Sequence, residues 1–178
     1  MGSAADSRAS DARFTEQALV LVLADLAGFT KAVGHLPAVE IAAVIDRFYT
    51  LCGPLVAEHG GRVIKYSGDN CLAVFEPQAA PEAVRFVLAL RDAVTGMGRD
   101  VGLDIDLGAN VHLATVATGT FGVAPAVDDI MGMGVVHVHR MGSGVGIRIS
   151  EPVYRKLPSS ERGPWQKHQP PATYTFVS

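Results

Sequence analysis

The order of helical and extended segments is the feature that most constrains what this chain can fold into. Two long stretches, residues 37–59 and 81–95, place apolar side chains at helical spacing, and Pro37 suits a first helical turn. Short apolar runs typical of strands lie before, between and after these stretches, at residues 18–26, 62–66, 71–75 and 103–117. The resulting order, β-α-β-β-α-β, predicts an α+β fold with a ferredoxin-like antiparallel sheet and flanking helices.

The remainder of the chain extends this unit without dividing it. Beyond it we expect two more strands and a short helix, at residues 146–150, 172–177 and 151–157 respectively. Residues 132–144 fit neither a strand nor a helix pattern clearly. Small polar residues predict a disordered lead over residues 1–15. Because no internal repeat or long linker interrupts the rest, we expect one domain over residues 16–178.

The composition is that of an ordinary soluble globular domain. Hydrophobic residues make up 48% and charged residues 19% of the 178 residues, which allows a sizeable core. The net charge of -3 argues against a nucleic-acid-binding surface, and no apolar run is long enough to span a membrane. Cys52 and Cys71 form neither a metal-binding motif nor a disulfide framework. We therefore expect a reducing, cytoplasmic environment.

Two aspartates stand at the ends of predicted strands, where a carboxylate is costly to bury unless it meets a cation. Asp25 closes the first apolar run, and Gly28 after it lets the backbone turn so that main-chain N–H groups face an anion. Asp69 lies in the turn between two apolar strands. If these strands are neighbours, the carboxylates converge and make, with phosphate oxygens, a natural Mg²⁺ site. Spacing alone leaves open that Asp25 caps a helix and Asp69 is only a turn residue.

Four blocks of sequence, in order and at matching intervals, resemble the signatures of class III adenylyl and guanylyl cyclases. LADLAGFT at residues 23–30 resembles F-x-D-I-x-G-F-T, and KYSGD at residues 65–69 resembles the K-x-x-G-D hairpin. The block DIMG from Asp129, with Arg140 eleven residues later, resembles D-I-W-G-x-x-V-N-x-x-x-R. GIRISEPVY at residues 146–154 resembles the G-x-I-x-x-S-E-x-V-Y stretch that follows. The resemblance implies a catalytic domain of the class III nucleotidyl cyclase fold.

The resemblance also implies a two-metal active site. Asp25 and Asp69 would bind two Mg²⁺ or Mn²⁺ ions, with a main-chain contribution from Leu26. One ion would activate the ribose 3′-hydroxyl and the other would hold the triphosphate, so that the hydroxyl attacks the α-phosphate in line and pyrophosphate leaves. The substrate phosphates would contact the segment that carries Gly28, Phe29 and Thr30.

Base choice and charge stabilisation are implied to depend on three further residues. Lys65 and Asp129 match the purine-selecting pair, in which lysine donates to adenine N1 and aspartate accepts from the 6-amino group; this implies ATP as substrate and cyclic AMP as product. Arg140 matches the arginine that stabilises charge building on the α-phosphate. In the family these three residues and the metal-binding aspartates come from different subunits. The resemblance therefore implies a homodimer with two equivalent shared sites.

The chain departs from the family pattern at Val136, where the family has an asparagine that orients the ribose. Valine makes no hydrogen bond, and losing such a contact is expected to lower the rate on the order of tenfold to a thousandfold. The neighbouring His137 and His139 would point to different sides of a helix but would share one face of a strand, and we expect no transition-metal site there. His112, on a predicted strand, is expected to be a packed core histidine.

Two other functions remain open from the sequence. One is a degenerate cyclase-homology domain that binds nucleotide or a partner without cyclising, which Val136 favours and the two aspartates oppose. The other is an enzyme of the same fold with an altered substrate, in which Val136 and the histidines belong to a reshaped pocket.

Overall fold

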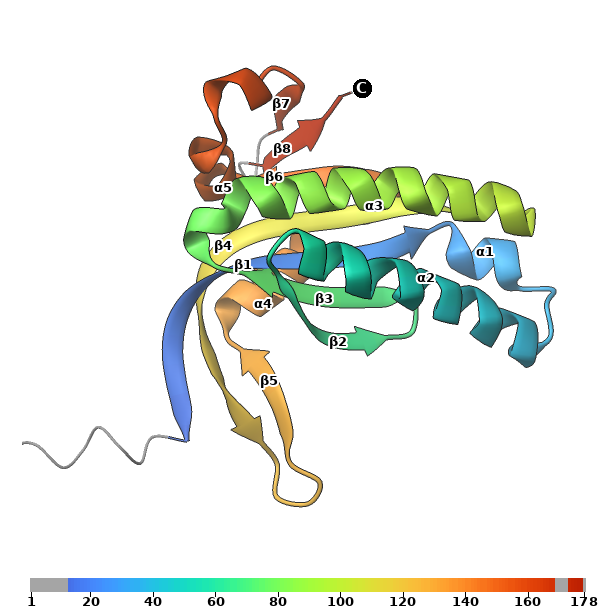
Figure 1. Cartoon of the computed structure of the whole chain (residues 1–178), viewed down its shortest axis with the longest axis horizontal. Helices are drawn as coiled ribbons and strands as arrows, with labels where there is room; N and C mark the ends of the chain where they lie inside the picture. The colour runs from blue at the N-terminus through green and yellow to red at the C-terminus, as the bar shows by residue number, and fades with distance from the viewer. Residues whose placement is uncertain (1–12, 169–172, 178) are drawn as a thin grey trace, which may run out of the picture.

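The computed structural model describes residues 13–168 and 173–177 and arranges them around one mixed sheet (Figure 1). The strands are β1 (Phe14–Ala27), β2 (Arg62–Ser67), β3 (Asn70–Phe75), β4 (Asp106–Phe121), β5 (Val127–Met131), β6 (Gly146–Ser150), β7 (Trp165–His168) and β8 (Thr173–Phe176). The helices are α1 (Phe29–Val33), α2 (Ala38–Glu58), α3 (Ala80–Val101), α4 (Met133–Arg140) and α5 (Glu151–Lys156), with 3₁₀ helices at Pro77–Ala79 and Ser159–Glu161. Most of the predicted lead, residues 1–12, lies outside the described residues, and β1 already begins at Phe14.

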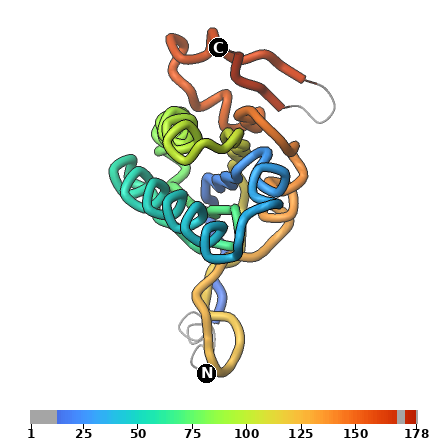
Figure 2. The backbone as a smooth tube through the Cα atoms, turned by 90° about the vertical axis from the view of Figure 1, so that its right-hand side faces the viewer, coloured from blue at the N-terminus to red at the C-terminus, as the bar shows by residue number. Residues whose placement is uncertain are grey.

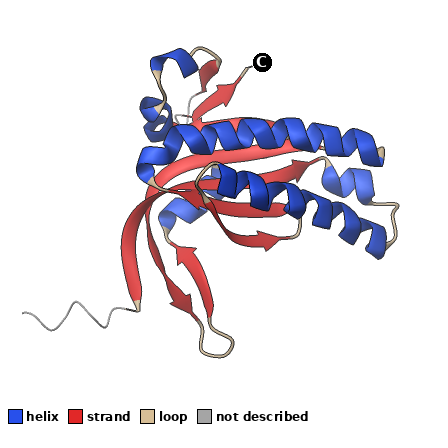
Figure 3. Ribbon diagram, viewed as in Figure 1, coloured by secondary structure: helices blue, strands red, loops and turns tan. Residues whose placement is uncertain are grey.

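The strand order confirms the predicted architecture (Figure 3). β2, β3, β1 and β4 are neighbours in that order and pair antiparallel, which is the ferredoxin-like arrangement. β6 pairs with β4 in parallel, β8 and β7 continue beyond it, and β5 pairs separately with β4. β1 lies at the centre, with Asp25 opposite Asn70 of β3 on one side and opposite Gly108 of β4 on the other. The end of β1 is therefore fixed by partners on both sides.

Alternation along β1 divides the apolar core in two. Every second side chain from Val20 packs in a larger core under α2 and α3, where Phe48 and Phe86 are fully buried. The intervening side chains, from Leu19, pack in a smaller core with Val138 of α4. Figure 2 shows α2 and α3, in teal and green, on the opposite side of the sheet from the orange segment that contains α4. Near this short helix several apolar side chains stay exposed, namely Met131, Met133 and Val136.

The far half of β4 and β5 form a hairpin that projects from the body of the molecule (Figure 1). The first part of β1 supports it, with the ring centroid of Phe14 at 4.7 Å from that of Phe121. Its tip carries the exposed side chains of Val123 and Val127. We expected the long strand to span residues 103–117 and did not predict β5. The chain instead remains helical to Val101, and β4 begins later and runs on into the hairpin.

Residues 132–144, for which no pattern was clear, contain α4. A Cβ on Gly134 would lie 2.5 Å from the Cβ of Ala114, so glycine at this position lets the helix approach β4 closely. The short elements α1 and β7 were also not predicted. The other expected helices and strands are present, β6 with the expected bounds and the rest with shifted ends. In the part of the chain that the structure describes, no helix combines the length and apolar character needed to cross a membrane.

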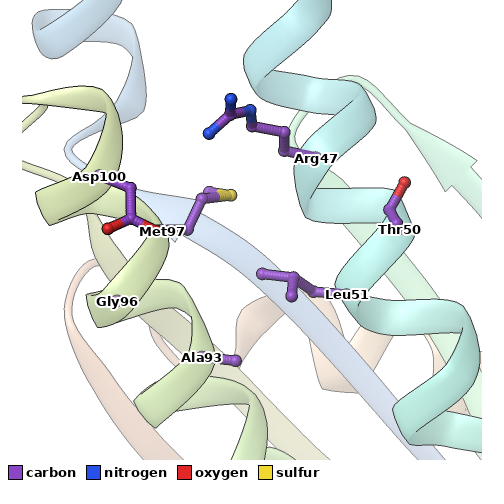
Figure 4. Close-up of a pocket in the computed structure, with 7 residues that line it drawn as sticks. All are labelled: Arg47, Thr50, Leu51, Ala93, Gly96, Met97 and Asp100. Atoms are coloured by element: carbon purple, nitrogen blue, oxygen red, sulfur yellow. The ribbon is translucent and has the colours of Figure 1, made fainter.

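A pocket of about 370 Å³ opens between α2 and α3 (Figure 4). Arg47 and Leu51 of α2 face Ala93, Met97 and Asp100 of α3 across it. None of the predicted site residues lines this pocket. It is therefore separate from the candidate active site.

Candidate active site

The structure brings Asp25 and Asp69 together at one end of the sheet. In the β1–β3 ladder, Asp25 lies opposite Asn70, the residue after Asp69. The main-chain N–H of Leu26 donates to the main-chain carbonyl of Asp69 at 3.2 Å, which holds the end of β1 beside the tip of the β2–β3 hairpin. The Nδ2 of Asn70 donates to Oδ1 of Asp69 at 2.9 Å and orients that carboxylate. Both aspartates thus lie at the same end of neighbouring strands.

The carboxylate of Asp25 sits in a confined place. Across the ladder lies Gly108, where a Cβ would come within 2.1 Å of Oδ1 of Asp25, so residue 108 has no room for a side chain. Burial, and next the negative charge of Asp69, raise the pKa of Asp25 to about 6, against a lowering by the positive charge of Arg148. A cation beside the two carboxylates would relieve both the burial penalty and their repulsion.

The oxygen atoms beside Asp25 and Asp69 suit the coordination of a hard divalent cation. Asp25 and Asp69 offer carboxylate oxygens, and the adjoining main chain at Leu26 offers a carbonyl oxygen, which are ligands that Mg²⁺ and Mn²⁺ prefer. Within residues 13–168 and 173–177, no three His, Cys, Asp or Glu side chains cluster as a ready-made cage. A metal held here would therefore complete its coordination with water and substrate oxygens, as Mg²⁺ in phosphate-binding sites commonly does.

Beside Asp25 the chain turns through Gly28 and leaves a pocket of about 290 Å³. Gly28 has φ 82°, a left-handed conformation that favours glycine. A Cβ there would also lie 3.0 Å from the carbonyl oxygen of Asp104. All predicted metal-binding and phosphate-binding residues except Asp69 line this pocket. Its walls are formed by Asp25, Leu26, Ala27, Gly28, Phe29, Thr30, Lys31 and Gly144.

Lys65 on β2 and Asp129 on β5 form an ion pair. The Nζ of Lys65 lies 2.6 Å from Oδ2 of Asp129, whose Oδ1 accepts the N–H of Ile130. The side chain of Asp129 is 12% exposed and that of Lys65 44%, so the carboxylate is recessed and the lysine reaches it from the surface. Asp128 instead accepts a hydrogen bond from the hydroxyl of Thr120, as alternation along a strand requires. The structure thus pairs Lys65 with Asp129 rather than with Asp128.

Arg140 lies at the end of α4, one turn after Val136 on the same exposed side of the helix. In the described part of the chain, no ion pair involves Arg140. Val136 is 38% exposed and offers no hydrogen bond. Neither residue lines the pocket beside Asp25, and neither Lys65 nor Asp129 does so.

The structure separates His137 from His139. The ring centroid of His137 lies 4.4 Å from that of His112 on β4, and burial together with His137 lowers the pKa of His112 to about 4. His139 instead lines a cavity of about 40 Å³ together with Lys65 and Asn70. The two α4 histidines point to different sides of α4, as expected for a helix.

Sequence reasoning did not single out Arg148, although it acts on the site. Its Nη2 donates to the main-chain carbonyl of Ser143 at 2.8 Å and, at longer distance, to that of Val145, while Nη1 makes longer contacts to those of Gly144 and Gly146. Its positive charge lowers the pKa of Asp25. The available signal was a charged residue between the buried Ile147 and Ile149, which alternation places on the opposite face of β6.

Comparison with known sequences gives one family. Residues 13–168 match the family described as the Adenylate and Guanylate cyclase catalytic domain. An adenylate cyclase of Mycobacterium tuberculosis (strain ATCC 25618 / H37Rv) is 28% identical over 145 residues, which cover 77% of this chain and 33% of that protein. An adenylate cyclase of Anabaena cylindrica is 24% identical over 157 residues, which cover 80% of this chain and 31% of that protein. The chain thus spans about a third of the length of these curated relatives.

Solved structures share the fold. The adenylyl cyclase CyaB from P. aeruginosa superposes with a TM-score of 0.82 at 16% identity, covering 93% of this chain and 96% of that chain. The guanylyl cyclase Cya2 superposes with a TM-score of 0.81 at 19% identity, covering 91% of this chain and 92% of that chain. At these identities the likeness establishes the fold alone.

Proposed function

Because the chain belongs to the adenylate and guanylate cyclase catalytic domain family, we propose that it converts ATP into cyclic AMP and pyrophosphate in the cytoplasm. The observation that carries the proposal is the placement of Asp25 and Asp69 at one end of the sheet beside the pocket at Gly28. The raised pKa of Asp25 supports it, because a carboxylate that is partly buried beside a second one gains most from a bound cation.

Asp25, Asp69 and the main chain at Leu26 are the groups that would hold two Mg²⁺ or Mn²⁺ ions. When bound, the ions supply activation of the ribose 3′-hydroxyl and neutralise charge on the triphosphate. The segment from Gly28 to Thr30 positions the phosphates, because its main chain borders the pocket that begins at Asp25. The contribution of these residues is to hold the reacting groups in line rather than to form a covalent intermediate.

Lys65 and Asp129 read the purine in this proposal. The ammonium of Lys65 donates to N1 of adenine, and the carboxylate of Asp129 accepts from the 6-amino group. Guanine presents the opposite pattern, an N1–H donor and a 6-oxo acceptor, and would meet a donor and an acceptor of the wrong kind. The 2.6 Å contact between Lys65 and Asp129 supports a joint role in binding the base, because the two charged groups already lie next to each other.

Each site would be shared between two copies of the chain. The walls of the pocket beside Asp25 do not include Lys65, Asp129 or Arg140, which supports their acting at the pocket of a second copy. The exposed apolar side chains of Met131, Met133 and Val136 near α4 support a partner on that side. In a symmetric pair, Arg140 of one copy would stabilise the α-phosphate charge at the aspartates of the other.

The test is product formation by the purified protein. Incubation with ATP, GTP, CTP or UTP and Mn²⁺ is expected to give cyclic AMP from ATP as the main cyclic product, and no cyclic product from any nucleotide would refute the proposal. Asp25→Ala is expected to abolish the activity. Asp92→Asn on α3, with a side chain 75% exposed beside Arg91, is the matched control that should retain it.

One observation favours a second candidate. Val136 removes the hydrogen bond that would orient the ribose, which suits a domain that binds nucleotide without cyclising it. Such a domain would bind ATP in the presence of Mn²⁺, as measured by calorimetry, and would form no cyclic AMP in the product assay. If the wild type forms cyclic AMP and the rate falls in Asp25→Ala, this second candidate is excluded.

A further inference from the structure

The tip of the β2–β3 hairpin is held from the side of α2 by a tyrosine. The hydroxyl of Tyr49 donates to the main-chain carbonyl of Gly68 at 2.6 Å. Gly68 has φ 58° and directly precedes Asp69 in a turn with two residues between the strands. This hydrogen bond therefore fixes the main chain directly before Asp69.

A second tyrosine fixes the first. The rings of Tyr49 and Tyr66 stack with centroids 4.1 Å apart and planes 21° from parallel, and the Tyr66 hydroxyl lies 3.4 Å from the main-chain oxygen of Tyr49. One turn further along α2, Gly53 leaves room for that hydroxyl, since a Cβ there would stand 3.3 Å from it. We call Tyr49, Tyr66 and Gly68 the tyrosine clasp.

The clasp and β1 hold the hairpin tip from two sides. On the β1 side, the N–H of Leu26 donates to the carbonyl of Asp69 at 3.2 Å. On the α2 side, the Tyr49 hydroxyl donates to the carbonyl of Gly68, the residue directly before Asp69. Because Asp25 and Asp69 repel each other without a cation, a tip held by β1 alone would be free to move the two carboxylates apart.

We propose that Tyr49 is a positioning residue for the metal ligand Asp69, acting through its hydrogen bond to the carbonyl of Gly68. The inference rests on the proposed function, in which Asp69 binds the divalent cation. Tyr49 touches neither metal nor nucleotide in this account. Its hydroxyl holds the hairpin tip so that the Asp69 carboxylate stays within reach of an ion bound at Asp25.

Tyr49→Phe tests this role, because it keeps the ring stack and removes only the hydroxyl. Mn²⁺ binding to the nucleotide-free protein is measured by electron paramagnetic resonance, and activity is measured across a Mn²⁺ titration. The concentration for half-saturation is expected to rise on the order of threefold to tenfold in both measurements, as loss of one oriented hydrogen bond allows. At saturating Mn²⁺, the rate is expected to return close to that of the wild type.

Thr95→Val is the matched control. The hydroxyl of Thr95 donates to the main-chain carbonyl of Arg91 at 2.9 Å on α3, so the variant loses a similar hydrogen bond outside the candidate site. It is expected to bind Mn²⁺ as the wild type does, even where thermal unfolding shows the same loss of stability as Tyr49→Phe.

The outcomes separate this inference from the proposed function. A wild type that binds Mn²⁺ and is active, with an unchanged half-saturating concentration in Tyr49→Phe, overturns the role of Tyr49 alone. A lower rate of Tyr49→Phe at saturating Mn²⁺, with unchanged Mn²⁺ affinity, also overturns the role of Tyr49 alone. A wild type that binds no Mn²⁺ overturns both claims.

Discussion

Replacing Asp25 by asparagine is expected to stabilise the metal-free protein while removing its activity. The pKa of Asp25 is raised from 3.8 to about 6, mainly by burial and then by Asp69. This difference corresponds to about 3 kcal/mol for a fully enclosed group, at 1.36 kcal/mol per tenfold change. Because solvent still reaches the carboxylate, screening reduces the expected gain for Asp25→Asn to about 1 to 2 kcal/mol at pH 7.5.

The size of this gain depends on pH in a defined way. The folded pKa of Asp25 lies above the unfolded one, so the native state binds the proton more tightly and stability falls as pH rises from about 4 to about 6. The gain from Asp25→Asn is therefore nearly complete above pH 6 and small at pH 3.5, where the carboxyl is protonated in the folded state and mostly protonated in the unfolded state.

Urea unfolding without divalent cations, at pH 7.5 and at pH 3.5, measures this gain. Asp92→Asn, an exposed substitution on α3, is the control that should stay within about 0.5 kcal/mol of the wild type. Adding Mn²⁺ is expected to stabilise the wild type and not Asp25→Asn. A variant that is less stable than the wild type at pH 7.5, or that Mn²⁺ stabilises equally, would refute the assignment of Asp25 as a metal ligand.

Base choice, ribose contact and the half-buried His112 give three further expectations. Lys65→Glu with Asp129→Cys moves the preference from ATP toward GTP, read as the ratio of cyclic GMP to cyclic AMP from equal substrate; an unchanged ratio would contradict the role of the pair. Val136→Asn raises turnover of ATP on the order of tenfold or more in initial rates at saturating Mn²⁺, and no rise would mean that the ribose is held differently. The pKa of His112 lies at about 4, below its ordinary 6.5, so the protein loses stability as pH falls from about 6.5 to 4. His112→Gln should flatten this loss in urea unfolding, and an equal loss would rule out His112 as its source.

The fold could be predicted because its core elements have clear local patterns. β1 contains a continuous apolar run that suits a strand buried on both faces, and the side chains that α2 buries, such as Phe48 and Cys52, recur at helical spacing. The placement of Asp25 and Asp69 followed from two strand ends that meet in the ladder. These features depend on local sequence and on the order of the elements, and both can be read from the sequence.

The features that could not be predicted depend on tertiary contacts, which a local sequence pattern does not indicate. β5 has five residues with two aspartates among them and becomes a strand because β4 extends beyond the sheet to pair with it. α4 is seated by Gly134 against Ala114, a close approach that no periodicity indicates. The hydroxyl of Tyr49 and the guanidinium of Arg148 donate to main-chain carbonyls, those of Gly68 and Ser143, so the side-chain types of their partners gave no signal.

The central claim is a cyclase whose active site is completed by a second copy of the chain, and mixing two inactive variants tests it most directly. Asp25→Ala and Arg140→Ala damage opposite halves of each shared site, and each alone is expected to form almost no cyclic AMP from ATP and Mn²⁺. After equal amounts are unfolded and refolded together, half of the dimers are mixed, and each mixed dimer has one intact site of two. The account predicts that the mixture recovers about a quarter of the wild-type rate. A mixture as inactive as its components, formed from variants that fold and dimerise, would contradict the shared site.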